Sequence, residues 1–290
     1  VISLSSYFCF NFAVFILSRN ICYIMCLMFL LGVLAQENLP WDQFARGSSY
    51  IAASYVKYLE AAGARVVPIR LLLPGGDVDL QTSQFSRAAK IFYNLALKGN
   101  DAGDYFPIWG TCQGFQQLTV LTANKNLLTL TDTKAVALPL TLTSVAPSSR
   151  LFRNFPKDLL RSLASENITA NFHSWSLSIR NAKLRRFYKI LSTNSDGKKE
   201  FISTMEANHY PFYAVQWHPE KSPFEWVDKP GMIHSVSAVR ASFYTASFFV
   251  SEGNTKSVQS KGRSLVRKYS PHSDHHNSEM YTIQGRMNLC

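Results

Sequence analysis

The chain contains little cysteine, and its cysteines follow no pattern that would identify a class of protein. Five occur in 290 residues: Cys9, Cys22, Cys26, Cys112 and Cys290. Their spacing fits neither a metal site nor a disulfide framework within the predicted core. Charged residues are also scarce, at 17% against 47% apolar residues. A chain of this length and composition can bury a full core, as one large or two small domains.

The chain also lacks a recognisable nucleic-acid-binding motif, although its net charge is +11. A basic protein attracts acidic partners, and nucleic acid is the usual one. Here the positive charge is spread along the chain and concentrates in its C-terminal tail, which is not the pattern of a nucleic-acid interface. We therefore expect no nucleic-acid partner, whereas an acidic small-molecule ligand stays open.

Cys112 lies in a Gly-Thr-Cys-Gln-Gly stretch that has the form of a nucleophile elbow. Residues 105–109 have strand character, and residues 115–121 place apolar side chains on one helical face. The spacing Gly110-x-Cys112-x-Gly114 puts small residues on both sides of a sharply bent nucleophile. A helix N-terminus just after the thiol favours the thiolate and leaves N–H groups free for an oxyanion. A lone cysteine is more often a small packing residue, but the two glycines favour the catalytic interpretation.

His218 is the candidate base. Residues 213–217 alternate as a half-buried strand does, and Pro219 ends that strand, so His218 lies at a strand end with Glu220 two residues further on. Such a glutamate can bind one imidazole nitrogen while the other faces the thiol, as in a catalytic triad. A His-Pro-Glu stretch alone is weak evidence, because surface histidines beside turns are commoner than catalytic ones.

Together the two stretches resemble class I glutamine-amidotransferase-like enzymes, and more closely the γ-glutamyl hydrolases, which are folylpolyglutamate hydrolases. The similar segments are residues 50–60, 62–68, 109–112, 171–177 and 216–221. The resemblance extends over residues 29–252. It implies an α/β, flavodoxin-like, three-layer α/β/α fold with a mostly parallel sheet and the nucleophile at the carboxyl end of a strand.

The resemblance also implies a reaction, the hydrolysis of γ-glutamyl bonds in folylpoly-γ-glutamates by a cysteine peptidase. Cys112 is expected to attack the γ-carbonyl, and His218 is expected to act as general acid and base. Glu220 is expected to orient His218. His173 is expected to line the cleft and support activity, whereas a core-edge histidine is the alternative. No metal and no organic cofactor is expected.

The oxyanion hole of the family includes a backbone N–H from a Pro-Gly-Gly loop, which here is Pro74-Gly75-Gly76. We expect Gly75 or Gly76 to donate one N–H and Gln113 the other. The sequence departs from the family just before this loop, where a helical crossover of well over a dozen residues is missing near residue 70. A parallel connection normally needs such a crossover. We therefore expect that one strand is lost, or that the chain turns sharply and displaces the two glycines.

The remaining periodicity predicts a domain of alternating strands and helices. Helices are expected at residues 50–61, 83–98, 157–163 and 239–250, with Gly63 and Gly99 just beyond the first two. Strands are expected at 65–69, 127–130, 135–143, 187–193 and 200–206, the last two joined through an Asn-Ser-Asp-Gly hairpin. The resemblance implies a further strand at 29–37.

The N-terminal segment, residues 1–28, is apolar and allows several interpretations: a signal sequence, a membrane anchor, or a gene-model artefact with the true start at Met25. We prefer residues 29–252 as the catalytic domain, with 29–37 as its first strand and 253–290 as a polar, basic, flexible tail. The tail histidines could bind metal, but a solvated tail is the simpler interpretation. The resemblance implies a lysosomal and secreted protein that can form a homodimer, and Asn167 begins an N-glycosylation triplet.

Gln116 keeps a second activity open. Animal γ-glutamyl hydrolases commonly have glutamate at this position, whereas glutamine amidotransferase domains have glutamine. One alternative is therefore an amidotransferase-type amidase. The other, which follows from the shortened connection near residue 70, is a catalytically impaired homologue that only binds folylpolyglutamate. Endo versus exo cleavage stays open.

Overall fold

The structure is a computed structural model that describes residues 29–43, 45, 47–67, 71–178, 182–252 and 283–284. The N-terminal segment 1–28, with its alternative interpretations, lies outside the described residues, as does almost all of the tail 253–290. Within the described part, Cys112 is a free, buried cysteine. None of the helices in this part is long and apolar enough to cross a membrane.

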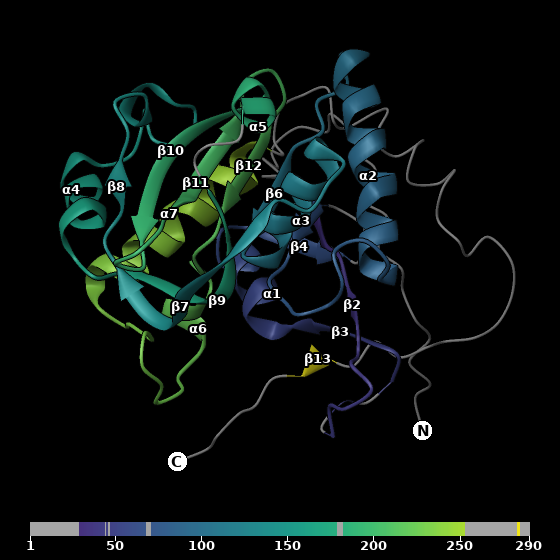
Figure 1. Ribbon diagram of the computed structural model, residues 1–290, viewed down its shortest axis with the longest axis horizontal. Helices are drawn as coiled ribbons and strands as arrows, with labels where there is room; N and C mark the ends of the chain where they lie inside the picture. The colour runs from purple at the N-terminus through teal and green to yellow at the C-terminus, as the bar shows by residue number, and fades with distance from the viewer. Residues whose placement is uncertain are drawn as a thin grey trace, which may run out of the picture.

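An eight-stranded sheet occupies the centre of the molecule (Figure 1), in the order β4-β1-β5-β6-β12-β11-β10-β8. The strands are, in that order, Ala64–Val67, Phe29–Val33, Leu71–Leu73, Ile108–Thr111, Phe212–Val215, Glu200–Ala207, Tyr188–Ser195 and Thr141–Leu142. The first five are parallel and the last three antiparallel. Numbered along the chain, the parallel strands have the order 2-1-3-4-5, which is the flavodoxin order. The predicted flavodoxin-like fold is confirmed.

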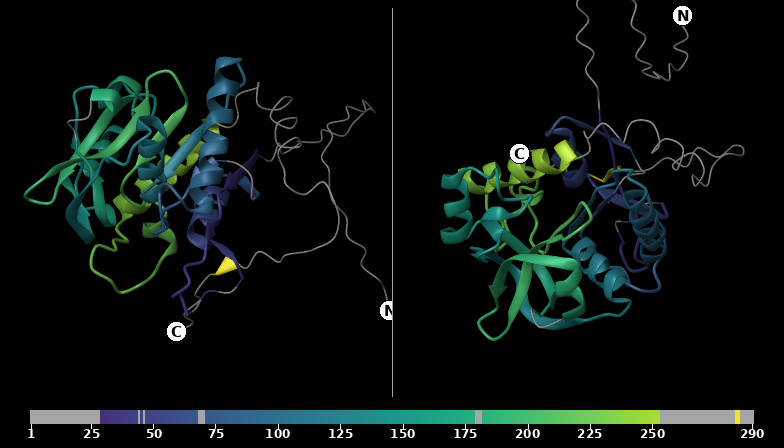
Figure 2. Two further views of the ribbon diagram at one scale, coloured as in Figure 1. Left: turned by 45° about the vertical axis from the view of Figure 1, so that its right-hand side comes forward. Right: turned by 90° about the horizontal axis from the view of Figure 1, so that it is seen from above.

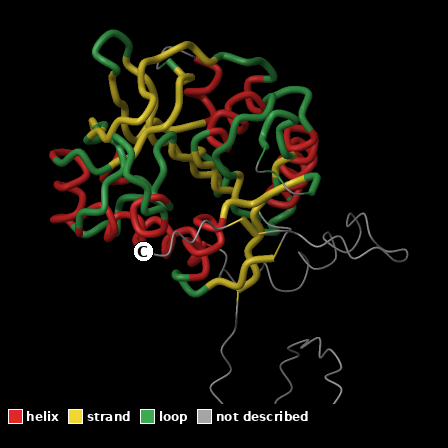
Figure 3. The backbone as a smooth tube through the Cα atoms, turned by 90° about the horizontal axis from the view of Figure 1, so that it is seen from below, coloured by secondary structure: helices red, strands yellow, loops and turns green. Residues whose placement is uncertain are grey.

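Helices cover both faces of the sheet (Figures 2 and 3). One face packs against α1 (Ala53–Glu60), α4 (Lys157–Ser165) and α7 (Val236–Glu252), and the other against α2 (Gln84–Asp101), α3 (Gln113–Ala123) and α5 (Ala182–Phe187). Side chains alternate between the faces, so that Leu72 and Trp109 join the first core while Leu71 and Ile108 join the second. Two apolar cores therefore clamp the sheet in a three-layer α/β/α arrangement.

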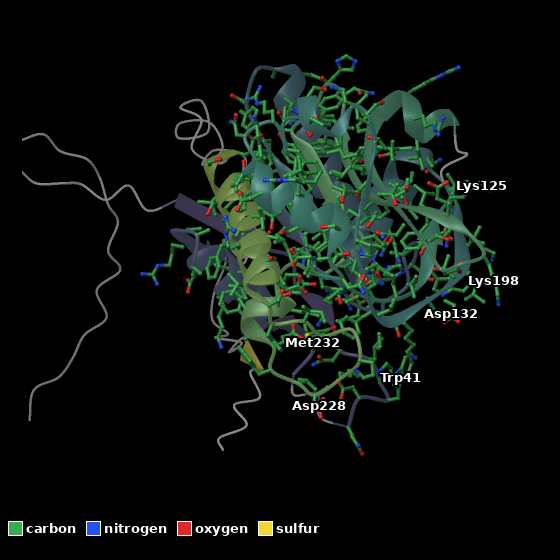
Figure 4. All side chains as sticks on the ribbon, turned by 90° about the vertical axis from the view of Figure 1, so that its left-hand side faces the viewer. Trp41, Lys125, Asp132, Lys198, Asp228 and Met232 are labelled. Atoms are coloured by element: carbon green, nitrogen blue, oxygen red, sulfur yellow. The ribbon has the colours of Figure 1, made fainter. Side chains whose placement is uncertain are left out.

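Two smaller sheets lie beside the main one. The antiparallel pair of β7 (Leu128–Leu138) and β9 (Thr169–Leu177) is tied to the hairpin between β10 and β11. The Asp132 N–H donates to Asp196 at 3.0 Å, and Figure 4 shows Asp132 and Lys198 at the same end of the molecule. The other small sheet consists of β2 (Gln36–Glu37), β3 (Ser49–Ala52) and β13 (Ile283–Gln284). Short helices complete the domain: η1 (Ala146–Ser148) and α6 (Lys221–Phe224).

The predicted helices and strands are present among the described residues, although most boundaries differ by one to three residues. Three of the differences have a clear structural cause. The helix expected from residue 50 begins at Ala53, because Tyr50 pairs with Gln36 in the β2–β3 ladder. The helix expected to end before Gly99 continues to Asp101, because the left-handed residue that ends it is Gly103, with φ 82°. The expected strand 29–37 divides into β1 and β2, which belong to different sheets.

The strands expected at 127–130 and 135–143 form a single strand, β7, followed by the short β8. Ala135 joins the two parts with φ 64°, where the register with β9 shifts. A bulge of this kind keeps both parts in one ladder while bending the strand. Sequence periodicity contains no signal for such a bulge at an alanine.

The expectation that the shortened connection near residue 70 removes a strand or displaces the glycine loop is wrong. Both β4 and β5 are present, and they lie on opposite sides of β1 rather than next to one another. Val67 at the end of β4 and Leu71 at the start of β5 both pair with Gly32. Val67 and Leu71 therefore lie two strand spacings apart, about 10 Å. The four residue steps between them can span about 13 Å, so no helical crossover is needed to connect the two strands.

Helix α3 lies so close to the sheet that only glycine fits at its first turn. A Cβ atom built on Gly114 would lie 2.0 Å from the carbonyl oxygen of Leu73, and one on Gly110 would lie 2.7 Å from the carbonyl carbon of Gly114. Backbone atoms occupy both positions, so no side-chain movement could relieve the overlap. The two glycines of the elbow therefore set the distance between α3 and the ends of β5 and β6.

We predict that Gly114→Ala destabilises the domain, because the added methyl group must push α3 away from β5. Overpacking of this kind costs about 1–3 kcal/mol, so the melting temperature should fall. Gly99→Ala is the matched control, since its Cβ would lie at an ordinary 3.6 Å from Asp104, and alanine is favoured in a helix by up to about 1 kcal/mol. Equal melting temperatures for the two variants would contradict the close packing of α3.

Candidate active site

Cys112 occupies the turn between β6 and α3, as the elbow spacing predicts. It is the N-cap residue of α3, with φ 50° and ψ −104°, a conformation that costs free energy for any residue with a Cβ. Two backbone hydrogen bonds hold the turn: the Cys112 N–H donates to Val215 at 2.9 Å, and the Gln116 N–H donates to Cys112 at 3.0 Å. The side chain is almost completely buried at the carboxyl end of the sheet.

His218 follows β12, the strand next to β6 in the sheet, and its ring hydrogen bonds both Cys112 and Glu220. Its Nδ1 lies 2.6 Å from Oε1 of Glu220. Its own N–H donates to the carbonyl of Ala170 in β9 at 2.9 Å, which fixes the backbone at the strand end. The structure thus brings together the three residues that the sequence predicted as nucleophile, base and orienting carboxylate.

Electrostatics favour a charged imidazole at this position. Burial alone would lower the pKa of His218, but the Glu220 carboxylate and the Cys112 side chain together raise it to about 9. Burial alone would raise the pKa of Glu220, but the charge and hydrogen bond of His218 outweigh it and lower that pKa. Each partner therefore stabilises the charged form of the other in a site that is largely buried.

The Pro-Gly-Gly loop after β5 reaches the site. A Cβ atom built on Gly75 would lie 2.7 Å from Cε1 of His218 and 3.3 Å from Cβ of Cys112, so only glycine fits there. The Gly75 N–H donates to the hydroxyl of Tyr55 at 2.7 Å, whereas no described residue accepts from the Gly76 N–H. Of the two expected donors, Gly76 is therefore the one available to an oxyanion.

The second expected oxyanion donor is the N–H of Gln113, the first residue of α3. The N–H groups of a first helical turn have no acceptor within the helix, and they add the positive end of the helix dipole. Gln113 itself is buried, with its side chain turned toward Gln36 and Val78. The expected donors are therefore two backbone groups from different elements, which an oxyanion would need at a fixed separation.

His173 lies on β9, in hydrogen-bonding contact with polar neighbours rather than with Cys112. Its Nδ1 is 3.0 Å from the hydroxyl of Thr133, and its Nε2 is 3.1 Å from Oδ1 of Asn171. Burial and the nearby charge of His218 lower the pKa of His173 to about 3. It is therefore neutral at working pH and suited to hydrogen bonding, not to proton transfer.

Sequence reasoning missed two side chains at this site, Tyr55 and Lys221. Tyr55 lies within the helix expected at residues 50–61, where a buried tyrosine gives no sign that its hydroxyl meets a loop. The ammonium group of Lys221 contacts Glu225 at 2.6 Å. Burial opposes the charge of Lys221, but Glu220 and Glu225 raise its pKa. Its position directly after the His-Pro-Glu stretch could have drawn attention to it.

The structure also gives the positions of two other predicted residues, Asn167 and Gln116. Asn167 is exposed on the turn between α4 and β9, while Thr169 of the same triplet is buried and donates to Leu138. Gln116 lies one turn along α3 and donates to the carbonyl of Trp175 at 2.8 Å. Glycosylation at Asn167 and the effect of Gln116 on substrate choice stay predictions.

The geometry as a whole defines a class of site. A cysteine, a histidine and a glutamate meet at the carboxyl ends of neighbouring parallel strands in a flavodoxin-like fold, with two backbone N–H groups beside the thiol. That is the arrangement of an acyl-transferring Cys-His-Glu triad.

Comparison with known proteins narrows this class to a family. The model of the family described as Peptidase C26 matches residues 71–220. Gamma-glutamyl hydrolase of Rattus norvegicus is 54% identical over 244 residues, covering 77% of each chain. Gamma-glutamyl hydrolase of Homo sapiens is 49% identical over 268 residues, covering 83% of this chain and 84% of its own length. This chain belongs to the γ-glutamyl hydrolase family.

Two further comparisons are with a more distant relative and with a solved structure. Gamma-glutamyl hydrolase B of Dictyostelium discoideum is 36% identical over 270 residues, which cover 83% of this chain and 78% of that protein. Among solved structures, one titled "Structure of PurLQS from Thermotoga maritima" superposes on 74% of this chain and 97% of its own, with 16% identity and a TM-score of 0.46.

We predict that Glu220→Gln lowers the pKa of His218, because glutamine keeps a hydrogen-bond acceptor for Nδ1 but removes the charge that raises it. A group whose folded pKa is raised keeps its proton until the pH rises through that value, so the parent should hold the imidazolium up to about pH 9. The alkaline limb of activity in the variant should move down by about one pH unit or more.

The measurement is the pH dependence of kcat, with the rate of Cys112 alkylation by iodoacetamide followed in parallel. Glu225→Gln is the control, since Glu225 pairs with Lys221 rather than with His218. An alkaline limb at the same pH in the Glu220→Gln variant and the parent would show that this carboxylate does not set the charge of His218.

Proposed function

We propose that this chain hydrolyses the γ-glutamyl bonds of folylpoly-γ-glutamates through a thioester on Cys112. The observation that carries the proposal is the Cys112–His218–Glu220 arrangement, with a 2.6 Å contact between His218 and Glu220. Membership of the γ-glutamyl hydrolase family supports the choice of bond and substrate. The net charge of +11 suits a polyanionic substrate.

The reaction follows from the positions of the groups. Sγ of Cys112 attacks the γ-carbonyl carbon, an S–C bond forms, and the carbonyl oxygen becomes an oxyanion bound by the N–H groups of Gln113 and Gly76. The imidazolium of His218 then gives its proton to the leaving amine as the C–N bond breaks. In the second half, the neutral ring of His218 takes a proton from water, and the resulting hydroxide attacks the thioester. The C–S bond breaks, a carboxylic acid leaves, and the thiolate of Cys112 and the imidazolium of His218 are regenerated.

The charge state of His218 suits the first of these steps. Because its pKa is raised to about 9, the ring carries a proton at neutral pH and can donate it without first taking one from solvent. Glu220 holds Nδ1 and so directs the other ring nitrogen toward the thiol. His173, which is neutral, supports the site as a hydrogen-bonding group.

Two other functions remain as alternatives. Gln116 would suit an amidase of the glutamine amidotransferase type, which would release ammonia from glutamine. A catalytically impaired homologue would bind folylpolyglutamate without turnover. Mass spectrometry of pteroylpentaglutamate after incubation with the chain separates them: shortened chains support the hydrolase, ammonia release from glutamine supports the amidase, and binding without turnover supports the impaired homologue.

The proposal extends to where the protein acts. We infer passage through the secretory pathway to the lysosome or the extracellular space, with glycosylation at Asn167, which is exposed as an acceptor must be. A homodimer is also part of the proposal, on the strength of the family resemblance alone.

We predict that Cys112→Ala abolishes hydrolysis and leaves substrate binding nearly intact, since the change deletes the nucleophile but removes little ground-state contact. Turnover of pteroylpentaglutamate and its dissociation constant should be measured on the same preparation. Residual turnover above about one per cent of the parent rate, on the scale of nucleophile knockouts, would exclude Cys112 as the nucleophile.

A further inference from the structure

The Pro-Gly-Gly loop is held at both ends by side chains from other elements. At one end the Gly75 N–H donates to the hydroxyl of Tyr55 on α1 at 2.7 Å. At the other end the carbonyl of Val78 accepts from the side-chain amide of Gln113 on α3. Gln113 therefore has two roles, because its backbone N–H is an expected oxyanion donor and its side chain fixes the loop that supplies the other donor.

The side-chain amide of Gln113 belongs to a chain of buried hydrogen bonds. The Tyr50 hydroxyl donates to Oε1 of Gln36 at 3.2 Å, and Nε2 of Gln36 donates to Oε1 of Gln113 at 2.8 Å. The Val78 carbonyl can only accept, so it fixes the orientation of Gln113 and, through it, the orientation of Gln36. Both glutamines are at most 4% exposed, so water does not compete for these bonds.

Gln36 also supports Gly76 directly. A Cβ atom built on Gly76 would lie 1.7 Å from Oε1 and 2.4 Å from Nε2 of Gln36. The Cα of Gly76 therefore rests against the face of the Gln36 carboxamide, with no space for any side chain between them. Gln36 therefore contacts both structural elements that carry an expected oxyanion donor. It packs against Gly76 in the glycine loop, and it hydrogen bonds the side chain of Gln113 on α3.

We propose that the Gln36–Gln113 amide pair is a positioning device for the oxyanion hole, which sets the separation of the Gln113 and Gly76 N–H groups. The inference rests on the proposed function and deepens it. Backbone donors on two different elements stabilise an oxyanion only when both are in place before the reaction. A rigid, buried link between those elements supplies that fixed geometry, and neither glutamine touches the substrate in this role.

The test replaces each glutamine by methionine, which keeps the length of the side chain and removes the amide. For Gln36→Met and Gln113→Met we expect kcat for pteroylpentaglutamate to fall about tenfold or more. This is less than the loss of about 10²–10³ in kcat that follows removal of a whole oxyanion donor. KM should stay within about twofold, because ground-state contacts remain. The double variant should lose about as much as either single variant, since both break one link.

A matched control is available on the same helix. Gln117 is fully buried and also binds the segment after the loop, through Leu80 at 3.2 Å and Ser86 at 3.1 Å. Gln117→Met should lower the melting temperature as much as Gln113→Met but leave kcat close to the parent value. Equal losses of kcat in the Gln113 and Gln117 variants would mean that any buried amide on α3 has this effect, and the inference would be overturned.

A second readout separates positioning from general damage. An N-pteroyl glutamate γ-semialdehyde, in which the acylated amine cannot cyclise onto the aldehyde, forms a hemithioacetal with Cys112. An S–C bond forms, and the former carbonyl oxygen, which takes the thiol proton, occupies the oxyanion position. We expect its inhibition constant to rise in step with the loss of kcat in the Gln36 and Gln113 variants, while the rate of Cys112 alkylation by iodoacetamide stays at the parent value. Unchanged aldehyde affinity in variants of low kcat would overturn the inference.

Should the methionine variants fail to fold, Tyr50→Phe tests the same chain from its outer end. It removes only the 3.2 Å hydrogen bond to Gln36. We expect kcat to fall less than in the methionine variants, and we expect the aldehyde affinity to fall by the same factor as kcat. The parent is measured in every assay. An inactive parent would refute the proposed function, whereas an active parent with unchanged Gln36, Gln113 and Tyr50 variants would refute this inference alone.

Discussion

The backbone at Cys112 is the constraint on which the rest of the site depends. A residue with a side chain is held at φ 50° where β6 turns into α3, and this conformation is unfavourable in isolation. It persists because the glycines on either side let α3 lie directly against Leu73. The strained turn places Cys112 just after the end of β6 and directly before the first N–H groups of the helix. The position of the nucleophile and of one oxyanion donor therefore has a single structural origin.

The other groups reach this point because the carboxyl ends of parallel strands meet at one edge of the sheet. The glycine loop follows β5, Cys112 follows β6, and His218 follows β12, three neighbouring strands in the order observed. Burial then decides the electrostatics. With water excluded, the Glu220 carboxylate outweighs the desolvation that would lower the pKa of His218, and an isolated histidine in the same cavity would be neutral, as His173 is.

Much of this could be predicted from the sequence, because it depends on local pattern and spacing. The glycine spacing around Cys112 and the strand before His218 were sufficient to place both residues, and the flavodoxin-like sheet followed from the resemblance. The sequence could not show that both strands survive the shortened connection near residue 70. That result depends on the order of the strands in the sheet, in which β4 and β5 lie on either side of β1 and both pair with Gly32. The Tyr55 hydroxyl and the Gln36–Gln113 contact, between residues 77 positions apart, were equally invisible because they exist only in the folded chain.

The most direct test of the central claim is a rapid acid quench during turnover of pteroylpentaglutamate, followed by peptide mapping by mass spectrometry. A thioester survives acid, so the acyl group should be found on the peptide that contains Cys112. The mass increase should equal that of the substrate portion on the carbonyl side of the cleaved bond, from the pteroyl group to the acyl glutamate. The same peptide should be unmodified when the chain is quenched before substrate is added. Hydrolysis accompanied by an acyl group on another residue, or by no acyl group on any peptide, would contradict covalent catalysis by Cys112.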